Sequence, residues 1–348
     1  MVASNIAAAP HVTTPIFAGV DVGGTCIKLG VINDNGRILS HDKLETRSFR
    51  EPAEAMRESG KSLMRQLAGL GHRLSDVRAV GLGTPGPMDI ARGLILTPGN
   101  LPTWRNSPVR DLLRDACNGL PVTLTNDANA AAFGEFWLGA GRDASSLVLL
   151  TLGTGVGGGI IVDGYCIQGA HSAAAEIGHI CIDRRPDARL CPCGQRGHLE
   201  AYASATALVN RARETLETEA LSSLKVAIDE GQELNGLLIY QHALTGDSLA
   251  HRLILETADY LAWGIADLAH VVDPEIFVLG GAMNFGGNQS PLGRKFIERI
   301  EQGVRSLAFP VISGSLKIVF SQLGNDAGFV GAAGLARQQS LSQHLTQQ

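Results

Sequence analysis

Short apolar runs alternate with glycine-rich or polar turns near the start of the chain. Residues 16–20 lead through Asp21-Val22-Gly23-Gly24-Thr25 into a second apolar run at 27–32, and a polar turn follows at 33–36. Apolar runs of this length, bounded by glycine, asparagine and aspartate, are typical of strands. The pattern therefore predicts a β-hairpin whose connection is rich in glycine.

The same pattern returns in the second half of the chain. Residues 147–152 form an apolar run, 153–159 a glycine turn, 160–162 another apolar run, and Asp163-Gly164 a hairpin turn. A Rossmann fingerprint would continue into a helix, and the P-loop string is missing from the sequence. Glycines in a hairpin let backbone N–H groups approach an anion. Two such hairpins facing one cleft would hold the phosphates of one nucleotide from both sides.

The remaining periodicity completes two similar α/β units, each opening with a hairpin rather than a βαβ crossover. Helices are expected at 51–70, 109–117, 204–218, 250–272 and 327–336, and further strands at 79–82, 122–124 and 276–281. A chain of 348 residues is long enough for two domains.

Composition narrows the class of protein. Apolar residues make up 45% and charged residues 18%, which is typical of a folded globular chain. A net charge of −5 without any run of Lys and Arg argues against a nucleic-acid surface. Residues 1–15 lack the basic residues of a signal peptide and are expected to be a disordered tail. With no long apolar segment, we expect a cytoplasmic protein with reduced cysteines.

Asp127 is the first candidate for chemistry. The string Asn126-Asp127-Ala128-Asn129-Ala130 follows a predicted strand and begins an alanine-rich, helix-prone stretch. The N-terminus of a helix favours an anionic carboxylate, so Asp127 is expected to be ionised. The residues alone leave two alternatives open, a helix cap formed by Asn126 or Asp127 and a catalytic carboxylate.

Cys191 and Cys193 begin the strongest local motif, Cys-Pro-Cys-Gly-Gln-Arg-Gly-His, which ends at His198. With His179 as a fourth ligand, two sulfurs and two imidazoles suit tetrahedral Zn²⁺. The alternative is a pair of reduced cysteines beside a surface histidine. A metal in this loop would also fix Glu176 and Glu200, which lie close to His179 and His198 in the sequence.

Taken together, these strings resemble the ROK (repressor, open reading frame, kinase) family of sugar kinases, and within it the bacterial glucokinases. The resemblance extends over residues 17–336, and its motifs occur in the family's order. They are Asp21-Val22-Gly23-Gly24-Thr25, Gly83-Thr84-Pro85-Gly86-Pro87, residues 126–130, Gly153 to Gly159, Glu176-Ile177-Gly178-His179, Cys191 to Glu200, and Leu279-Gly280-Gly281.

The resemblance implies an actin-like, ribonuclease H-like ATPase duplication with a cleft between two α/β domains. We expect a smaller domain of residues 16–135 plus 325–337 and a larger one of 136–324 that contains the metal loop. Residues 338–348 are expected to be a polar tail. Family members are often dimers or tetramers, so a homodimer or homotetramer is expected.

The resemblance also implies residue roles. Asp127 is expected to be the base for the sugar's 6-hydroxyl, and Asp21 to help position Mg²⁺. The expected sugar-binding set is Gly86, Asn100, Asn126, Asp127, Glu176, His179 and Glu200. The expected ATP-binding set is Asp21, Gly23, Gly24, Thr25, Lys28, Gly153, Thr154, Gly155, Gly157, Gly158, Gly280 and Gly281. The expected Zn²⁺ ligands are His179, Cys191, Cys193 and His198, where His198 replaces the family's usual third cysteine.

The activity implied is ATP-dependent phosphorylation of a hexose, with glucose favoured. Fructose, mannose, allose and N-acetylmannosamine remain alternative acceptors, and polyphosphate an alternative donor. The family also contains sugar-responsive repressors with an N-terminal DNA-binding domain. Since the first glycine hairpin begins within about 20 residues of Met1, little chain is left for such a domain. A sugar-responsive, non-catalytic regulator is the third alternative.

Overall fold

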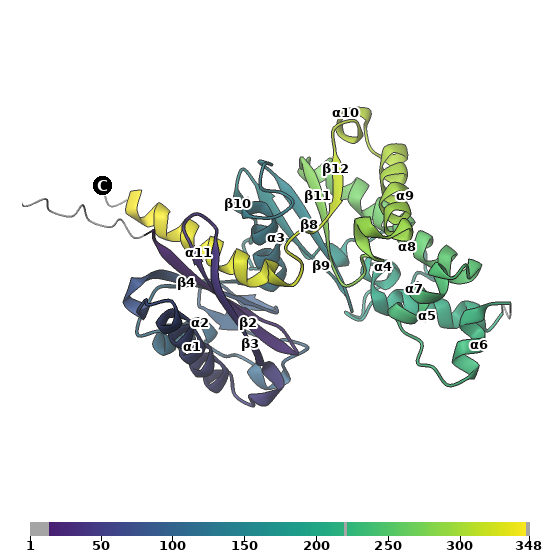
Figure 1. The fold of residues 1–348 in the computed structure, drawn as a ribbon. Helices are drawn as coiled ribbons and strands as arrows, with labels where there is room; N and C mark the ends of the chain where they lie inside the picture. The colour runs from purple at the N-terminus through teal and green to yellow at the C-terminus, as the bar shows by residue number, and fades with distance from the viewer. Residues whose placement is uncertain (1–13, 219–220, 346–348) are drawn as a thin grey trace, which may run out of the picture.

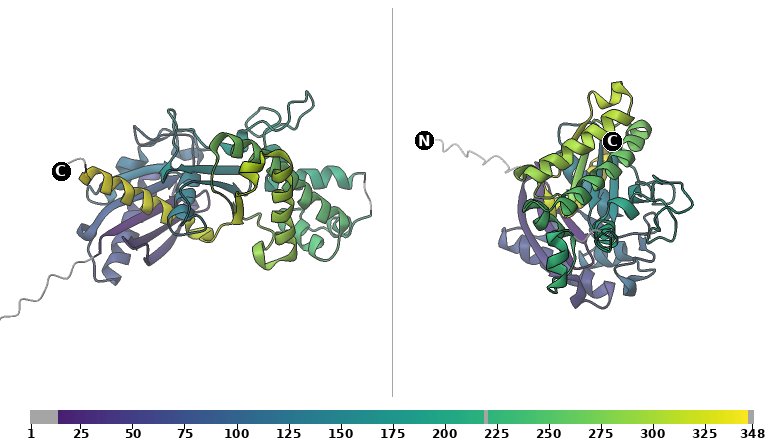
Figure 2. Two further views of the ribbon diagram at one scale, coloured as in Figure 1. Left: turned by 90° about the horizontal axis from the view of Figure 1, so that it is seen from above. Right: turned by 90° about the vertical axis from the view of Figure 1, so that its right-hand side faces the viewer.

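The computed structural model describes residues 14–218 and 221–345, which form two five-stranded sheets flanked by helices (Figures 1 and 2). Most of the expected N-terminal tail lies outside the described residues. The strands of the first sheet are β1 (Ile16–Val22), β2 (Cys26–Asn33), β3 (Ile38–Glu45), β4 (Val77–Thr84) and β7 (Val122–Asn126). Those of the second are β8 (Leu147–Leu152), β9 (Val156–Val162), β10 (Tyr165–Cys166), β11 (Ile276–Gly281) and β12 (Lys317–Phe320). A short ribbon joins β5 (Met88–Asp89) to β6 (Leu94–Ile95).

Both sheets have the same topology. The first has the order β3-β2-β1-β4-β7 and the second β10-β9-β8-β11-β12. In each sheet, the first three strands along the chain pair antiparallel with their neighbours, and the last two strands run parallel to the first strand. The predicted duplication is therefore confirmed. Its Asp163-Gly164 turn has φ values of 50° and 77°, as a two-residue hairpin turn requires.

Helices cover the sheets on both sides. They are α1 (Pro52–Gly69), α2 (Val109–Ala116), α3 (Asp127–Trp137), α4 (Glu200–Ala203), α5 (Ala205–Leu216), α6 (Ser223–Asp229), α7 (Gly236–Leu244), α8 (Ser248–Val272), α9 (Pro291–Leu307), α10 (Pro310–Ser313) and α11 (Ala327–Leu345). Apolar side chains of α1 and α2 pack on one face of the first sheet, while α11 covers the other face. Helices α4 to α9 pack around the second sheet and share one large core with it.

Helices α3 and α11 connect the two units. Helix α3 follows the last strand of the first sheet but packs against β8 and β9, whereas α11 follows the last strand of the second sheet and packs against β1 and β4. The two helices also contact each other closely, and Figure 1 shows them between the sheets. The start of α3, where Asp127 lies, is thereby placed at the junction of the two units.

Glycine is required where α11 lies on the first sheet. A Cβ atom at Gly81 would lie 1.8 Å from the carbonyl oxygen of Ala332, and one at Gly19 equally close to that of Phe329. Because the obstructing atoms are backbone, no side-chain rotation relieves the overlap.

Gly81→Ala is therefore expected to destabilise the protein. We expect the melting temperature to fall by roughly 5 °C, which corresponds to an overpacking cost of about 2–3 kcal/mol. The matched control is Gly69→Ala in α1, where a Cβ meets no atom within 4 Å. Thermal unfolding followed by circular dichroism measures both variants, and equal melting temperatures for the two would contradict this packing.

The structure differs from expectation at the C-terminal end. The helix predicted at 327–336 continues to Leu345, so residues 338–345, expected as a polar tail, are helical. No helix breaker interrupts this segment, and Thr123 Oγ1 donates a hydrogen bond to Gln339 Oε1, which ties the extra turns to β7. The domain boundaries stay a prediction. Among the described residues, no helix is long and apolar enough to cross a membrane.

Candidate active site

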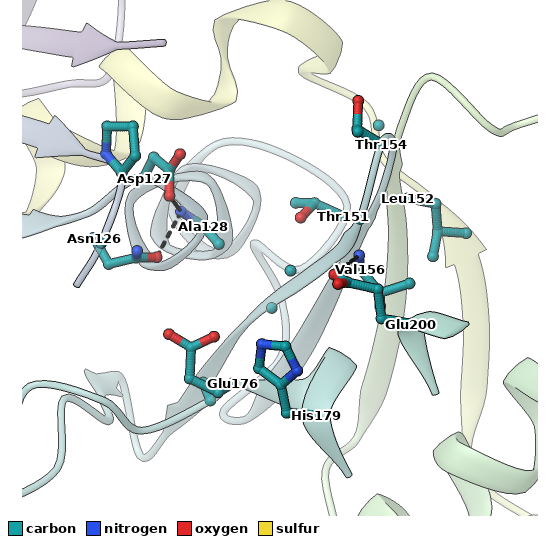
Figure 3. A pocket seen from close by; sticks show the side chains of 18 of the residues that line it. Asn126, Asp127, Ala128, Thr151, Leu152, Thr154, Val156, Glu176, His179 and Glu200 are labelled. Carbon is teal, nitrogen blue, oxygen red and sulfur yellow. Dashed lines mark hydrogen bonds between the residues drawn. The ribbon is translucent and has the colours of Figure 1, made fainter. Parts of the chain in front are cut away.

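A cavity of about 560 Å³ lies where β7 runs into α3 and faces the turn between β8 and β9 (Figure 3). Its lining comprises Pro85, Gly86, Pro87, Asn126, Asp127, Ala128, Thr151, Leu152, Gly153, Thr154, Gly155, Val156, Gly157, Gly158, Ala174, Ala175, Glu176, His179, Glu200 and Gly281. The cavity therefore combines segments from both units, and its polar side chains include three carboxylates.

Asn126, not Asp127, caps helix α3. The side-chain oxygen of Asn126 accepts hydrogen bonds from the backbone N–H groups of Ala128, at 2.9 Å, and Asn129, at 3.3 Å. Asp127 is the first residue of the helix, and its Oδ1 accepts a hydrogen bond from Ala128 N, at 2.9 Å. Since Asn126 performs the capping, the Asp127 carboxylate is not needed as the cap, and it lines the cavity.

Burial raises the pKa of Asp127, and the Glu176 carboxylate adds to the rise, although the hydrogen bond from Ala128 N opposes it. This rise is opposite in direction to the effect of the helix N-terminus, which favours the ionised carboxylate, and the expectation that Asp127 is ionised stays a prediction. Burial, and then the negative charge of Asp127, raises the pKa of Asp21 to about 7. A raised pKa makes a carboxylate a stronger base near neutral pH.

The two predicted glycine hairpins occupy different positions. Of the second, Gly153, Thr154, Gly155, Gly157 and Gly158 line the cavity, together with Gly281 at the end of β11. The other expected residues lie outside this lining, namely Asp21, Gly23, Gly24, Thr25, Lys28, Asn100 and Gly280.

Of those outlying residues, Asp21 lies near Asp127. Both are close to Gly83, where a Cβ would be 3.6 Å from Asp21 Oδ1 and 3.7 Å from Asp127 Cα. Lys28 Nζ donates to the carbonyl oxygen of Asn325 at 2.8 Å, which joins β2 to the start of α11. Position 24 lies beside Asn100, since its Cβ would be 3.1 Å from Asn100 Nδ2.

The four predicted metal ligands form one cluster. One ligand atom from each of His179, Cys191, Cys193 and His198 lies within 4.8 Å of the others. Cys191 Sγ is 3.8 Å from His179 Nδ1, and Cys193 Sγ is 3.2 Å from His198 Nδ1. Tetrahedral Zn²⁺ with sulfur and nitrogen ligands requires separations of about 3.5 Å, so the donor set and its spacing fit this ion. Burial raises the pKa of the Cys191 thiol to about 12, and a divalent cation would favour its thiolate.

Glu176, His179 and Glu200 reach the cavity from segments beside this cluster. Glu176 directly precedes a 3₁₀ turn, Ile177–His179, which ends at His179, and Glu200 begins α4 directly after the loop. Figure 3 shows Glu176 and Glu200 facing the cavity from opposite sides of His179. Glu200 Oε2 accepts a hydrogen bond from Val156 N at 2.9 Å, so this carboxylate also contacts the second glycine hairpin.

Several residues that line the cavity are not predicted from the sequence. Thr151 at the end of β8 is polar and faces the cavity. Ala174 and Ala175 precede Glu176, and Ala175 has a φ of 63°, which is uncommon for a residue with a Cβ. An alanine in a left-handed conformation carries no sequence signal, so these positions are visible only in three dimensions.

Comparison with known proteins gives consistent results. The family model described as "ROK family" matches residues 17–339. A glucokinase of Halalkalibacterium halodurans is 35% identical over 94% of this chain and 96% of its own length. The structure of a ROK family glucokinase from Streptomyces griseus, solved with glucose and AMPPNP, has a TM-score of 0.72 at 37% identity and covers 93% of this chain and 99% of that one. A ROK family transcriptional regulator, a homologue of the E. coli MLC protein, has a TM-score of 0.79 at 26% identity and covers 93% of this chain and 78% of that one.

Proposed function

This chain belongs to the ROK family, and we propose that it is an ATP-dependent glucokinase that phosphorylates the 6-hydroxyl of glucose. The chain is a sugar kinase with the actin-like ATPase fold. The observation that supports the chemical assignment most strongly is the position of Asp127, which does not cap its helix, within a cavity that is also lined by a glycine hairpin.

Phosphoryl transfer depends mainly on positioning and on neutralising charge. Asp127 would accept the proton of the attacking hydroxyl, and its raised pKa suits that task. The N–H groups of the 153–158 turn would face the phosphates, where backbone dipoles stabilise developing charge. Asp21 would help to hold the Mg²⁺ that accompanies ATP, which neutralises phosphate charge when bound.

We place glucose against Gly86, Asn126, Glu176, His179 and Glu200, which line the cavity around Asp127. Carboxylates suit a sugar because they accept hydrogen bonds from hydroxyl groups, and an imidazole that binds zinc through one nitrogen can donate a hydrogen bond from the other. Asn100 would approach from the side of the first hairpin, where it lies next to Gly24. Glucose is the sugar named for the similar glucokinases, and we propose that these side chains bind it in this chain.

Zn²⁺ is the ion we assign to His179, Cys191, Cys193 and His198. Its function would be structural, because a closed set of four protein ligands leaves no position for a substrate. The ion would fix the loop that precedes Glu200 and the turn that contains His179. Assembly into a dimer or tetramer stays a prediction.

The pH dependence of the reaction follows from the direction of the Asp127 shift. Asp127 must be deprotonated to act as the base, and its pKa is raised from the ordinary 3.8. Activity should therefore be present above the raised pKa and lost as the pH falls through it. We expect the acidic limb of kcat/KM for glucose at a higher pH than the ordinary aspartate value of 3.8. A limb at or below the ordinary aspartate value would contradict the environment described for Asp127.

Acceptor and donor specificity test the proposed function. A coupled ADP-release assay should be run with glucose, fructose, mannose, allose and N-acetylmannosamine, each with ATP, and polyphosphate should replace ATP with product formation followed directly. Glucose with ATP is expected to give the highest kcat/KM. A higher kcat/KM for another hexose would make that hexose the substrate of this family member. Turnover with polyphosphate but not with ATP would make polyphosphate the phosphoryl donor.

A sugar-responsive regulator is the second candidate, because a transcriptional regulator shares the fold with a TM-score of 0.79. That similarity is weaker in sequence, at 26% identity, than the similarity to the glucokinase structure at 37%. Specific, sugar-released binding of a DNA fragment in a gel-shift assay would favour the regulator.

A further inference from the structure

Three hydrogen bonds connect the turn between β8 and β9 to residues that lie outside the turn. Glu200 Oε2 accepts from Val156 N at 2.9 Å, Ala205 N donates to the carbonyl oxygen of Gly153 at 2.8 Å, and Thr206 Oγ1 donates to that of Thr154 at 2.8 Å. The three supporting residues come from α4 and the first turn of α5. The turn proposed to face the phosphates is thus fixed by the segment that directly follows the metal loop.

Glu200 and residue 155 fit each other. A Cβ atom at Gly155 would lie 2.3 Å from Glu200 Oε2, so only glycine leaves room for this carboxylate against the turn. The glycine at 155 is therefore explained by Glu200 as well as by the approach of an anion. Glu200 Oε1 lies 3.7 Å from Cys191 Sγ, so the same side chain contacts the metal cluster and the turn.

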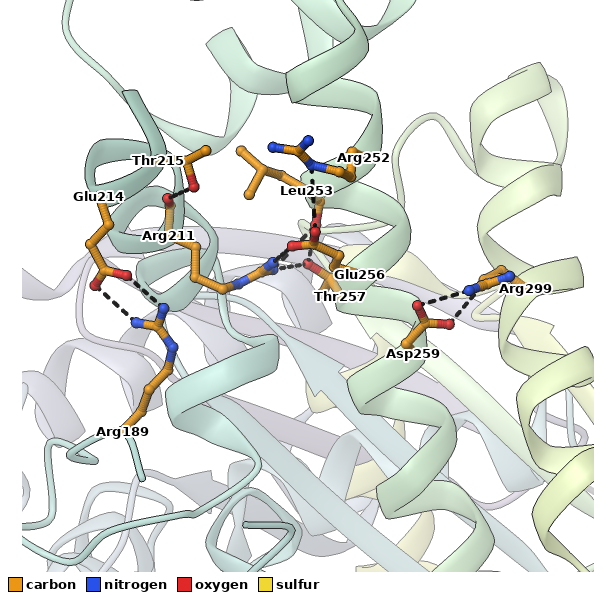
Figure 4. A network of polar contacts seen from close by, with 10 residues as sticks. All are labelled: Arg189, Arg211, Glu214, Thr215, Arg252, Leu253, Glu256, Thr257, Asp259 and Arg299. Carbon is orange, nitrogen blue, oxygen red and sulfur yellow. Dashed lines mark hydrogen bonds and ion pairs between the residues drawn. The ribbon is translucent and has the colours of Figure 1, made fainter. Parts of the chain in front are cut away.

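Helix α5, which carries part of this support, is firmly attached to the rest of its unit (Figure 4). The guanidinium of Arg211, on the buried face of α5, donates to Glu256 Oε2 at 2.9 Å and to the carbonyl oxygen of Leu253 at 3.2 Å, both in α8. Arg189, which precedes the metal loop by two residues, donates to Glu214 of α5 at 2.9 Å through its Nη1. Loop, α5 and α8 therefore form one connected support, and the turn is attached to it.

We infer that Glu200 is a positioning residue for the phosphate donor, in addition to its place in the proposed sugar subsite. It sets the conformation of the 153–156 turn before any sugar is bound, so nucleotide affinity depends on it. This inference rests on the proposed function, since it assumes that the turn binds a nucleotide. It distinguishes Glu200 from Glu176, which lines the same cavity and has no hydrogen bond to the turn among the contacts of the described residues.

The test is isothermal titration of AMPPNP and Mg²⁺ in the absence of any hexose. Glu200→Ala should weaken AMPPNP binding about tenfold, because it removes a hydrogen bond to a charged acceptor. Glu176→Ala is the matched control and should bind AMPPNP within twofold of the wild type. Glu200→Gln should restore part of the affinity, since an amide oxygen can still accept from Val156 N.

Steady-state kinetics provides a second readout that a general loss of folding would not reproduce. Glu176→Ala should raise KM for glucose alone, whereas Glu200→Ala should raise KM for both glucose and ATP. Thr206→Val removes the hydrogen bond from Thr206 Oγ1 to the turn. It should raise KM for ATP about threefold and leave KM for glucose unchanged, whereas Thr206→Ser keeps the hydroxyl and should have the wild-type KM for ATP.

Wild-type affinity for AMPPNP in Glu200→Ala, or an equal loss in Glu176→Ala, would overturn the inference and leave the proposed function standing. A wild-type protein that binds no AMPPNP and shows no turnover with ATP would overturn both. Melting temperatures of all variants should be measured alongside, and a folded Glu200→Ala protein makes its titration decisive. Should that variant fail to fold, the Thr206 pair decides, and an unchanged KM for ATP in Thr206→Val would count against the inference.

Discussion

Asp127→Asn is expected to lower kcat by about 10³-fold and to leave glucose affinity nearly unchanged. The amide removes the only function we assign to this side chain in the reaction, acceptance of the hydroxyl proton. It should preserve the local structure, because its oxygen can still accept from Ala128 N and Asn126 still caps the helix. Rapid-mix kinetics and titration with glucose would measure the two quantities separately.

The matched control for this change is Asp163→Asn. Asp163 lies in the hairpin turn between β9 and β10 at a φ of 50°, a conformation that asparagine also adopts. It changes the same carboxylate to an amide and should retain wild-type kcat. If Asp127→Asn kept kcat within tenfold of the wild type, Asp127 would not be the base.

From the sequence alone, Asp127 fits either a helix cap or a catalytic base, and the structure shows why. Both functions require a polar residue at the start of a helix that follows a strand, so the local string is the same for either. Only the positions of Ala128 N and Asn129 N show that Asn126 performs the capping. The raised pKa of Asp127 was not foreseeable, because it depends on burial at the junction of two units.

The fold was easier to predict from the sequence than the role of Asp127, because its signals are local and repeated. In the sequence, each hairpin consists of two apolar runs separated by glycines. The occurrence of two such hairpins predicted the duplicated sheets. The packing of α3 on the second unit and of α11 on the first has no local sequence signal apart from the glycines at 19, 81 and 159, and only the family resemblance placed residues 325–337 with the smaller domain. Their meaning depends on which backbone lies against them, and spacing alone does not contain that information.

Removal of the metal is expected to have the second largest effect. Because His179 belongs to both the cluster and the cavity lining, loss of the ion should loosen the proposed sugar subsite at its wall. We expect purified protein to contain about one zinc per chain. Chelation followed by desalting should raise KM for glucose more than tenfold, since disturbing the surroundings of a metal site commonly costs 10- to 100-fold.

Three substitutions test this prediction further. Cys193→Ser should lose zinc, because it removes one of the four ligands. Cys181→Ser is the matched control, since Cys181 is exposed beside the loop but does not belong to the cluster, and it should retain zinc. His198→Cys should also retain zinc, as sulfur is an accepted ligand at that position. Less than about 0.2 zinc per chain in the wild type would count against the site.

The most direct test of the central claim is identification of the product. The protein should be incubated with ATP, Mg²⁺ and glucose, and the sugar product analysed by mass spectrometry and by phosphorus–proton correlation NMR. We predict glucose 6-phosphate formed in equal amount to ADP. ADP release that does not depend on glucose, or a phosphate attached at any other hydroxyl, would contradict the account.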